Sequence, residues 1–532
     1  MNGGGRKAHI AGIGQSEYTR WGGIMDRSQF QVTAEAILAA LADAGLSAAD
    51  VDGFTSFSND GNDAPSMQVA LGVPELRFSA MVWGGGGGGS CGALSLATAA
   101  VESGQADVVV VYRGLCQGQG RRFGQAGLGR THGNFIMPFG LFAPSQMLAL
   151  MMQRFMHETS ASHEHMAEIA LSFRANANRN PNAIMHDRAL TKEDYFASRW
   201  IAEPFRLFDC CLESDGAAAV VVTTAERARD LKQRPVEVMA AAHGSGAGWG
   251  TGPLGAQNMP DETYASTNNR RIAKELFAKA GVTPADIDVA QIYDHFSGLV
   301  LMALEDFGFC GRGESGDFVA AGNIRFEGGS LPLNTSGGQL SEAYVHGVNL
   351  IIEGVRQLRG QSTSQVADAR TCLVTGGLGV SPTSAAILGV LVMALFPDEM
   401  PKVDPVWDDH DFWEHCRRRE LNFQACADCG APRHPPTPVC PACHSMKVKW
   451  LRAPADAELF SYTRVHYPSH PAVKGSLPYV IGLVVFPALP GVKLVSNVTD
   501  ADTVEIGMKL KLWWDDVGDG MYLPRFRPAA RS

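Results

Sequence analysis

Apolar and polar positions alternate along the first 395 residues in a way that predicts strands and helices in turn. In the first half, a glycine-rich turn at 84–89 precedes an apolar helix and a β-branched strand at 108–111. In the second half, glycines 337–338 precede a helix over 348–358 and a strand over 372–374. This alternation favours α/β layers with largely parallel sheets.

A stretch of nine residues occurs twice: AGLSAADVD at 44–52 returns as AGVTPADID at 280–288. Each copy follows an amphipathic helix, begins at a glycine stop and leads through a capped turn to an apolar strand. The matching flanks favour an internal duplication over a chance match.

The chain changes character after Phe396. Residues 397–405 have the proline-rich, charged composition of a linker. A short helix is expected over 407–419, and β-rich runs further on suit a small barrel. The sequence predicts five segments: an α/β half with an inserted loop region (residues 1–232), a second α/β half (233–396), a linker (397–408), a helix with a cysteine cluster (409–450) and a barrel (451–532).

Four cysteines form two C-x-x-C knuckles, Cys426 with Cys429 and Cys440 with Cys443. Four thiolates at this spacing can close a tetrahedron around Zn²⁺. Soft sulfur ligands select zinc or iron over magnesium or calcium. Because four protein ligands leave no open position, the sequence predicts a structural zinc site.

The composition is that of an ordinary soluble globular protein, with 45% hydrophobic and 19% charged residues. A net charge of −10 without a cluster of Lys and Arg argues against a nucleic-acid partner. The longest apolar run, residues 385–396, is too short to cross a bilayer, and no signal pattern precedes the first apolar segment. The other cysteines are scattered, as reduced and buried thiols are. We therefore expect a cytoplasmic protein without membrane insertion.

Residues 6–395 resemble the thiolases of the sterol-carrier-protein-X type along essentially the whole of that fold. Three stretches carry the resemblance: residues 93–107, YDHFS at 293–297, and residues 334–347, which begin NTSGG. The resemblance implies a duplicated thiolase fold, with two α/β halves in a layered αβαβα arrangement. It also implies an acyl-CoA substrate and a homodimer.

Residues 405–532 resemble the rubredoxin-like zinc-ribbon and OB-fold proteins that accompany thiolase-like enzymes. The helix with Phe412-Trp413, the ribbon, and the aromatic-rich start of the barrel at 459–463 carry this resemblance. It implies a barrel that contributes to acyl-CoA binding and complex assembly, and an acyl-CoA hydratase is a candidate partner. Apart from zinc, no cofactor is expected beyond the CoA of the substrate.

Both thiolase cysteines are missing. Thiolases place a nucleophilic cysteine at a helix N-terminus, where the dipole lowers the thiol pKa. That position falls on Gly87, with Cys91 one turn later; the second thiolase cysteine falls on Leu373, beside Cys372. Without a thiolate no acyl-enzyme forms, which removes thiolysis and Claisen condensation.

Two tyrosines occupy the other thiolase catalytic loops. Thiolases carry Asn or His where this chain has Tyr293, and a histidine where it has Tyr344, and His295 and His346 lie two residues further on. The pattern resembles the lipid-transfer-protein-like steroid side-chain aldolases, whose catalytic pair is tyrosine at these two positions. That family cleaves a 17-hydroxylated steroid acyl-CoA to a 17-ketosteroid and propionyl-CoA, in complex with ribbon/OB partners.

The sequence therefore predicts a carbon–carbon lyase that performs a retro-aldol reaction on a β-hydroxyacyl-CoA. Tyr293 and Tyr344 are assigned as the acid/base pair, without deciding which is the base. A tyrosine with its ordinary pKa near 10 is a poor base at pH 7. His295, His346 or Asp294 would have to accept its proton or lower its pKa.

The backbone N–H groups of Gly87, Gly88 and Gly377 are candidates for holding the thioester oxygen. Two other functions remain open at this point. One is a thiolase-type acyltransferase that uses Cys91 after a local shift. The other is a non-catalytic acyl-CoA or lipid carrier, in which the two tyrosines only make hydrogen bonds.

Overall fold

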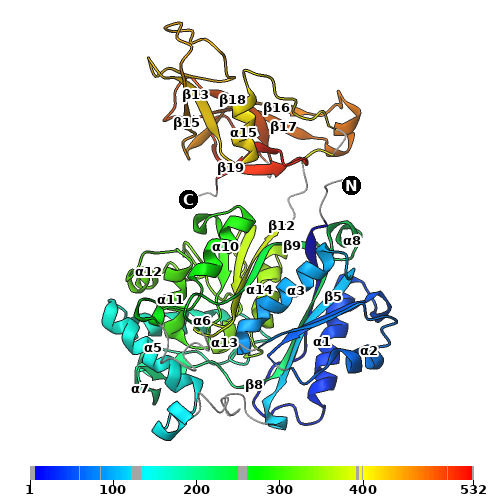
Figure 1. Ribbon diagram of the computed structural model, residues 1–532, viewed down its shortest axis with the longest axis vertical. Coiled ribbons are helices and arrows are strands. Elements are labelled where there is room, and N and C mark those ends of the chain that lie inside the picture. Colours follow the sequence, from blue (N-terminus) through cyan, green and yellow to red (C-terminus); the bar gives the residue numbers. More distant parts are fainter. Residues whose placement is uncertain are drawn as a thin grey trace. The chain divides into compact units, whose positions relative to one another are not determined.

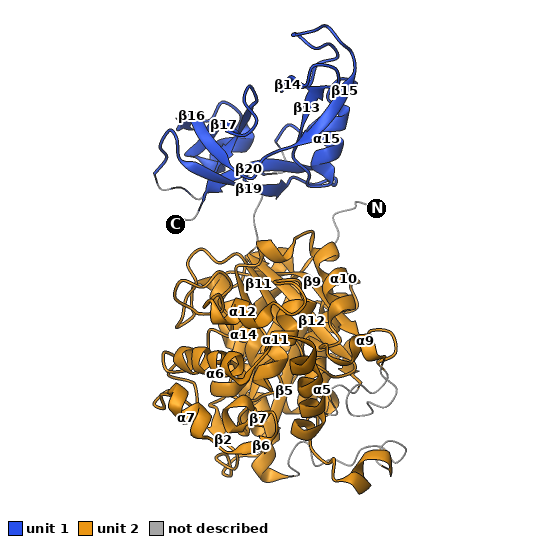
Figure 2. Ribbon diagram, turned by 90° about the vertical axis from the view of Figure 1, so that its left-hand side faces the viewer, with its two compact units in different colours: residues 1–4, 392–532 blue, residues 5–391 orange. Residues whose placement is uncertain are grey.

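Ten strands form one mixed sheet in the first of the two units into which the chain folds. The computed structural model describes residues 6–58, 60–83, 86–120, 134–249, 260–390, 395–397, 400–499, 501 and 503–529. The units are residues 5–391 and residues 392–532, orange and blue in Figure 2. The first unit holds the α/β body, and the second holds the cysteine knuckles and the barrel.

The strands of the sheet follow the order β10-β11-β12-β9-β1-β8-β5-β3-β4, with β2 beside β8. Their bounds are β1 Ala8–Gln15, β2 Thr19–Arg20, β3 Gly53–Phe57, β4 Phe78–Val82, β5 Val108–Cys116, β8 Ser214–Thr224, β9 Val236–Gly244, β10 Val289–Gln291, β11 Thr371–Thr375 and β12 Thr383–Val390.

The expectation of largely parallel sheets is wrong. Parallel pairing is confined to the two ends of the sheet, where β10 meets β11 and where β3 meets β4 and β5. The intervening pairs are antiparallel. Parallel neighbours are joined through helices, whereas β11 and β12 are joined by a short loop that permits antiparallel pairing. The helix–strand alternation along the sequence did not reveal how these central strands pair.

Four long helices arrange the sheet in layers (Figure 1). α1 (Gln29–Ala44) packs on β1, β5 and β8, and α10 (Arg270–Ala280) packs on β9 and β12. α3 (Ser90–Glu102) and α14 (Val348–Arg359) contact strands of both halves. The two central helices share the main hydrophobic core, and α1 closes a second core on the other face of the first half. The thiolase-like layering predicted from the sequence is confirmed.

The two copies of the repeat have the same conformation. α1 ends at Gly45, with a φ of 76°, and α10 ends at Gly281, with a φ of 67°. A 3-10 turn follows in each copy, and its carboxylate accepts a hydrogen bond from the backbone N–H of the capping residue. These bonds are 2.9 Å long and run from Ser47 to Asp50 and from Thr283 to Asp286. The matched geometry supports a duplication.

The last residue of each copy is an aspartate that fixes the next strand pair. The Asp52 carboxylate accepts the backbone N–H groups of Asp107 (2.9 Å) and Val108 (2.8 Å), at the start of β5. The Asp288 carboxylate accepts those of Arg370 (2.9 Å) and Thr371 (3.0 Å), at the start of β11. Each aspartate thus ties the start of its own strand, β3 or β10, to the start of the parallel neighbour, β5 or β11.

A helical insertion between β5 and β8 covers the second half. It contains α5 (Pro144–Glu158), α6 (His163–Ala177) and α7 (Lys192–Ala197). α6 packs on α11 (Ser297–Asp306), α12 (Ser315–Ala320) and α13 (Gly338–Ser341). The Asn176 side chain donates to the carbonyls of Leu333 (3.1 Å) and Asn334 (3.2 Å). The insertion therefore anchors the NTSGG loop from outside.

Several shorter elements complete this unit. They are α2 (Ala64–Leu71), β6 (Trp200–Ala202), β7 (Phe205–Arg206), α8 (Ala225–Arg229) and α9 (Asp261–Tyr264).

The second unit joins a small ribbon to a closed barrel. It begins with α15 (His410–Arg417) and a three-stranded sheet of β14 (Pro432–Arg433), β13 (Asn422–Cys426) and β15 (Val448–Arg452). Five strands close the barrel in the order β16-β17-β18-β20-β19. Their bounds are β16 Ala457–Val465, β17 Tyr479–Val485, β18 Lys493–Val498, β19 Lys509–Asp516 and β20 Tyr522–Pro528. The predicted ribbon and barrel are confirmed.

Within the described residues, none of the helices combines the length and apolar character that a bilayer crossing requires.

The aspartate at the end of the first repeat can be tested by substitution. We expect Asp52→Ala to lower the free energy of unfolding by about 1.5–3 kcal/mol, because two backbone N–H groups lose a charged acceptor. Chemical denaturation would measure this loss. Asp230→Ala, at the exposed C-terminal end of α8, is the matched control and should change stability little. Equal stability of the two variants would contradict a register-fixing role.

Candidate active site

Two tyrosines from separate loops of the second half meet in the core of the first unit. Tyr293 follows β10, and Tyr344 lies between α13 and α14. Their hydroxyl oxygens are 3.4 Å apart, and Tyr293 donates to Tyr344. Tyr293 is 1% exposed and Tyr344 is 8% exposed. The fold thus brings together the two side chains that the sequence assigned as a pair.

Gly87 lies against the Tyr293 hydroxyl at the start of a helical run. A 3-10 turn, Gly86–Gly89, leads directly into α3. A Cβ atom added to Gly87 would lie 1.7 Å from Oη of Tyr293, far inside contact distance. The phenol therefore fills the space beside the helix N-terminus that a side chain at position 87 would need. A cysteine at this position, as in thiolases, is incompatible with Tyr293 as it stands.

Backbone hydrogen bonds hold both tyrosine loops. The N–H of Tyr293 donates to Oγ1 of Thr375, at 2.8 Å. The N–H of Tyr344 donates to Oγ of Ser214 at 2.7 Å, and the same hydroxyl donates back to the Tyr344 carbonyl. Because Thr375 ends β11 and Ser214 begins β8, each tyrosine backbone is tied to the central sheet.

Asp294 connects the two tyrosine loops. Its buried carboxylate accepts the backbone N–H groups of Gln339 (2.8 Å) and Leu340 (3.0 Å), in α13 just before Tyr344. Burial raises the Asp294 pKa to about 7, although these hydrogen bonds oppose the shift. Its oxygens are directed at the backbone of the neighbouring loop, which indicates a positioning role.

The two histidines pack edge-on against the tyrosines. The ring centroids of Tyr293 and His295 are 5.1 Å apart, and so are those of Tyr344 and His346. Burial lowers the pKa of His295 to about 4, although the backbone of Tyr293 opposes this shift. Burial also lowers the pKa of His346 well below its ordinary value. Both imidazoles are therefore neutral at pH 7.

Burial also raises the pKa of both phenols. The hydrogen bond from Tyr293 opposes this shift in Tyr344 and adds to it in Tyr293. Of the two, Tyr344 is the better candidate for the ionised form.

Hydrogen bonds hold the backbone of the glycine turn next to the tyrosines. The N–H of Gly377 donates to the Gly87 carbonyl at 2.9 Å, and Oγ of Ser384 donates to the Gly88 carbonyl at 2.6 Å. The Gly377 N–H predicted to face a thioester oxygen is thus engaged within the protein. Gly87 and Gly88 lie in the first turn of the helical run, where N–H groups lack intrahelical acceptors.

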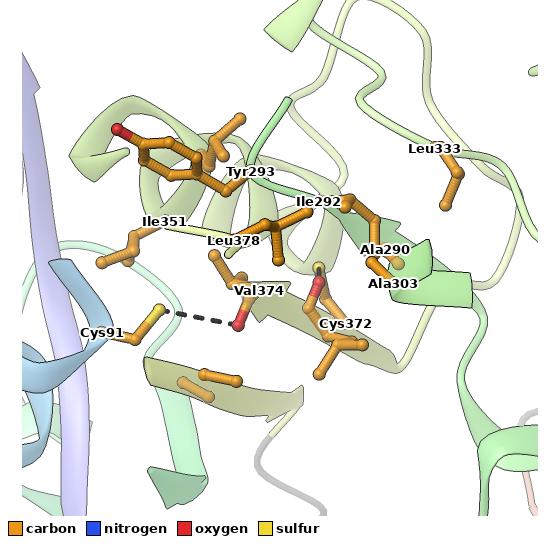
Figure 3. Packing of buried hydrophobic residues seen from close by; sticks show 14 of the residues in the cluster. Cys91, Ala290, Ile292, Tyr293, Ala303, Leu333, Ile351, Cys372, Val374 and Leu378 are labelled. Atoms are coloured by element: carbon orange, nitrogen blue, oxygen red, sulfur yellow. Dashed lines mark hydrogen bonds between the residues drawn. The ribbon is translucent and has the colours of Figure 1, made fainter. Parts of the chain in front are cut away.

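The two cysteines nearest the thiolase positions are buried. Cys91 directs its Sγ at the Val374 carbonyl, 3.5 Å away, and burial raises its pKa to about 12 (Figure 3). Burial also raises the pKa of Cys372 well above its ordinary value. Neither thiol is suited to form the thiolate that an acyl-enzyme requires.

Two residues near the tyrosines were missed in the sequence. Arg113, in β5, is 4% exposed, and its charge lowers the pKa of both phenols. Cys211 lies half-buried in a loop, and its backbone N–H donates to the His295 carbonyl. Its thiol group raises the pKa of both tyrosines. For Arg113, a charged residue within an apolar, β-branched strand was a usable signal in the sequence. For Cys211, a cysteine in a loop offered no such signal.

The four knuckle cysteines of the second unit converge on one point. Their sulfur atoms all lie within 4.8 Å of one another, with 3.5 Å between Cys426 and Cys443 and 3.6 Å between Cys429 and Cys440. Four sulfurs about 2.3 Å from one tetrahedral ion would be about 3.8 Å apart, so the donor set fits Zn²⁺. The predicted structural zinc site is confirmed in its donors and their spacing.

Family models match three parts of the chain. Residues 254–390 match the thiolase C-terminal domain-like family. Residues 413–448 match the ChsH2 rubredoxin-like zinc ribbon domain, and residues 450–515 match the ChsH2 C-terminal OB-fold domain. A probable enoyl-CoA hydratase alpha subunit of Thermomonospora curvata is 40% identical over 124 residues, which are 23% of this chain and 38% of that protein.

Full-length relatives match the thiolase-like body. The 17-hydroxy-3-oxo-4-pregnene-20-carboxyl-CoA lyase of Mycobacterium tuberculosis is 45% identical over 72% of this chain and 99% of its own length. The steroid side-chain-cleaving aldolase of Thermomonospora curvata is 44% identical over 72% of this chain and 97% of its own length. A solved Ltp2-ChsH2(DUF35) aldolase superposes with a TM-score of 0.68 at 42% identity, covering 73% of this chain and 98% of that one. This chain therefore belongs to the family of thiolase-fold, steroid side-chain-cleaving aldolases.

Proposed function

We propose that Tyr293 and Tyr344 carry out the proton transfers of a retro-aldol cleavage. The observation that supports this is the packing of the Tyr293 hydroxyl against Gly87, 3.4 Å from the Tyr344 hydroxyl. The phenols occupy the loop positions where thiolases carry Asn or His, and neither thiolase cysteine position holds a thiol, so the site can move protons without forming a covalent intermediate.

The reaction needs no co-reactant. A base takes the proton of the β-hydroxyl group, the Cα–Cβ bond breaks, and its electron pair passes into the thioester enolate. The β-carbon leaves as a ketone carbonyl. An acid then protonates the enolate at Cα to give the shorter acyl-CoA. The proton gained by the base equals the proton delivered by the acid, so the enzyme returns to its starting state.

The hydrogen bond between the tyrosines suggests their roles. Tyr344 accepts from Tyr293, which favours its ionised form, so we assign Tyr344 as the base and Tyr293 as the acid. After Tyr344 takes the hydroxyl proton, Tyr293 can protonate Cα and recover a proton from Tyr344 across the same bond.

The enolate oxygen needs donors that are fixed before the reaction. We propose the backbone N–H groups of Gly87 and Gly88, at the positive end of the helical run into α3. Gly377 supports them by donating to the Gly87 carbonyl. Its own use as an oxyanion donor would require that bond to open.

The residues beside the tyrosines orient them in this proposal. Asp294 fixes the loop that leads to Tyr344 through the backbone of Gln339 and Leu340. His295 and His346 present neutral rings that pack against the tyrosine rings and do not compete for protons at pH 7.

The names of the relatives supply the substrate class. We propose a tertiary β-hydroxyacyl-CoA in which the acyl chain is a steroid side chain hydroxylated at C17. The products would be a ketone and a short acyl-CoA such as propionyl-CoA. A hydratase is the proposed partner, because part of this chain is similar to a hydratase subunit. The homodimer and the cytoplasmic location remain predictions.

The acyltransferase alternative lacks structural support, because the Cys91 thiol is fully buried and its pKa is raised to about 12. A non-catalytic carrier would not require a glycine at position 87 with a phenol packed against it. We therefore do not retain either function.

The base can be tested with Tyr344→Phe, which removes one oxygen. We expect kcat for C–C cleavage to fall by about 10²–10⁴-fold, the usual contribution of a positioned acid or base. Product analysis with a 17-hydroxysteroid acyl-CoA measures turnover, and calorimetry checks that acyl-CoA binding persists. Tyr112→Phe, a buried tyrosine in the second core, is the control. Unchanged turnover in Tyr344→Phe would exclude Tyr344 from the mechanism.

The contact between Gly87 and Tyr293 predicts a strong effect of a single methyl group. We expect Gly87→Ala to lower kcat by about 10²-fold, because the phenol must move by an ångström or more. Gly61→Ala is the matched control, since the nearest atom to an added Cβ there is 3.9 Å away. If both variants were fully active, the packing of Tyr293 would be irrelevant to catalysis.

The metal site predicts a separable effect on the second unit. We expect Cys429→Ser or a strong chelator to remove zinc and unfold the ribbon, because structural zinc contributes its binding energy to folding. Metal analysis and calorimetry would follow both changes, with Cys116→Ser in β5 as a thiol control outside the cluster. A metal-free ribbon that melts at the same temperature would refute a structural role.

A further inference from the structure

We propose that Arg113 is a positioning residue for the tyrosine pair, whose buried positive charge favours the phenolate on which proton abstraction depends. The inference rests on the proposed function, because it assumes that a tyrosine must ionise. Arg113 acts through the tyrosines, and no contact with the substrate is required of it.

Arg113 is a charged residue among the apolar side chains of β5. Along β5, the side chains of Val109, Val111 and Leu115 lie in the main core, which also contains both catalytic tyrosines. Their neighbours Val108, Val110 and Tyr112 face the second core. Strand alternation puts Arg113 on the face of Val109 and Val111, so a charged side chain occupies a position of the main core.

Only some of the N–H groups of the guanidinium have hydrogen-bond partners in the described part of the chain. Its Nη1 donates to the Phe57 carbonyl at 2.8 Å and lies 3.3 Å from the Asp60 carboxylate. Its Nε is buried and has no hydrogen-bond partner among the described residues. The same carboxylate also accepts from Ser56 and from Asn62, at 2.9 Å and 2.6 Å. Asp60 is therefore held by several donors, and Arg113 meets it at 3.3 Å through Nη1 while its buried Nε has no partner among the described residues.

The Phe57 ring lies between Arg113 and the residues of the site. Its guanidinium carbon lies 5.2 Å from the centroid of the Phe57 ring. The same ring lies 6.3 Å from that of His346, and a Cβ on Gly89 would lie 2.5 Å from the Phe57 Cβ and 2.9 Å from the ring. A side chain from the first half thus adjoins both the His346 loop and the glycine turn.

A positive charge in this place would offset the increase in pKa that desolvation causes in the phenols. Cys211 and Arg113 act electrostatically on both phenols, and His295 and His346 pack against their rings. Of the nearby carboxylates, Asp60 is paired with Arg113, and Asp294 accepts from the backbone of α13. The two histidines are neutral, and the thiol of Cys211 raises the pKa of both phenols. Within the described part of the chain, Arg113 is the cation that lowers the pKa of both. Burying an arginine lowers stability, a cost that a core without a charge requirement would avoid.

The pH profile of kcat/KM distinguishes this role from a structural one. Removal of the charge in Arg113→Gln should raise the apparent pKa of the acid limb by about one unit or more. Activity should therefore fall most at neutral pH and recover in alkali. Arg113→Lys keeps the charge and should hold the limb near its original pH. A purely structural role would lower activity equally at every pH.

Asp60→Asn is the opposing variant, and it remains informative if Arg113→Gln fails to fold. It removes the negative partner and keeps the cation, so the acid limb should move to lower pH. Ultraviolet titration of tyrosinate should show the same opposite shifts. Acid limbs that stay in place in both variants would overturn the inference. The proposed function fails separately, if Tyr344→Phe remains active.

Discussion

The site depends on one steric constraint: position 87 has no side chain. The Tyr293 phenol packs where a Cβ at that position would lie, and it therefore reaches the N-terminal end of the helical run into α3. From there it can meet Tyr344, beside the glycine turn whose backbone amides we propose as donors to the thioester oxygen. The second half supplies the tyrosines and the first half supplies the space, so the chemistry arises only where both halves of the duplicated fold meet.

Burial has opposite consequences for the histidines and for the tyrosines of the site. It makes the histidines neutral and so prevents them from competing for protons, but it also disfavours the phenolate that a base requires. The hydrogen bond between the tyrosines and the charge of Arg113 both offset that penalty. A buried ion that would be a liability in an ordinary core is thus in a position to serve the reaction.

Much of this could be predicted from the sequence, because its strongest signals are local. The repeat at 44–52 and 280–288 specifies caps and turns within a few residues, and the C-x-x-C knuckles specify a metal site. The tyrosine pair followed from family resemblance. The antiparallel centre of the sheet was not predictable, because strand pairing depends on contacts distant in sequence. Arg113 was missed because strand alternation alone does not tell which face meets the site.

The contact between Gly87 and Tyr293 also constrains how such an enzyme could have arisen from a thiolase. The bulky phenol could enter only after the nucleophile had been reduced to a glycine, since the two side chains exclude each other. An intermediate ancestor would have had neither group and little of either activity. Reversal would have to pass through the same intermediate, because the phenol at position 293 must be lost before a side chain can return to position 87.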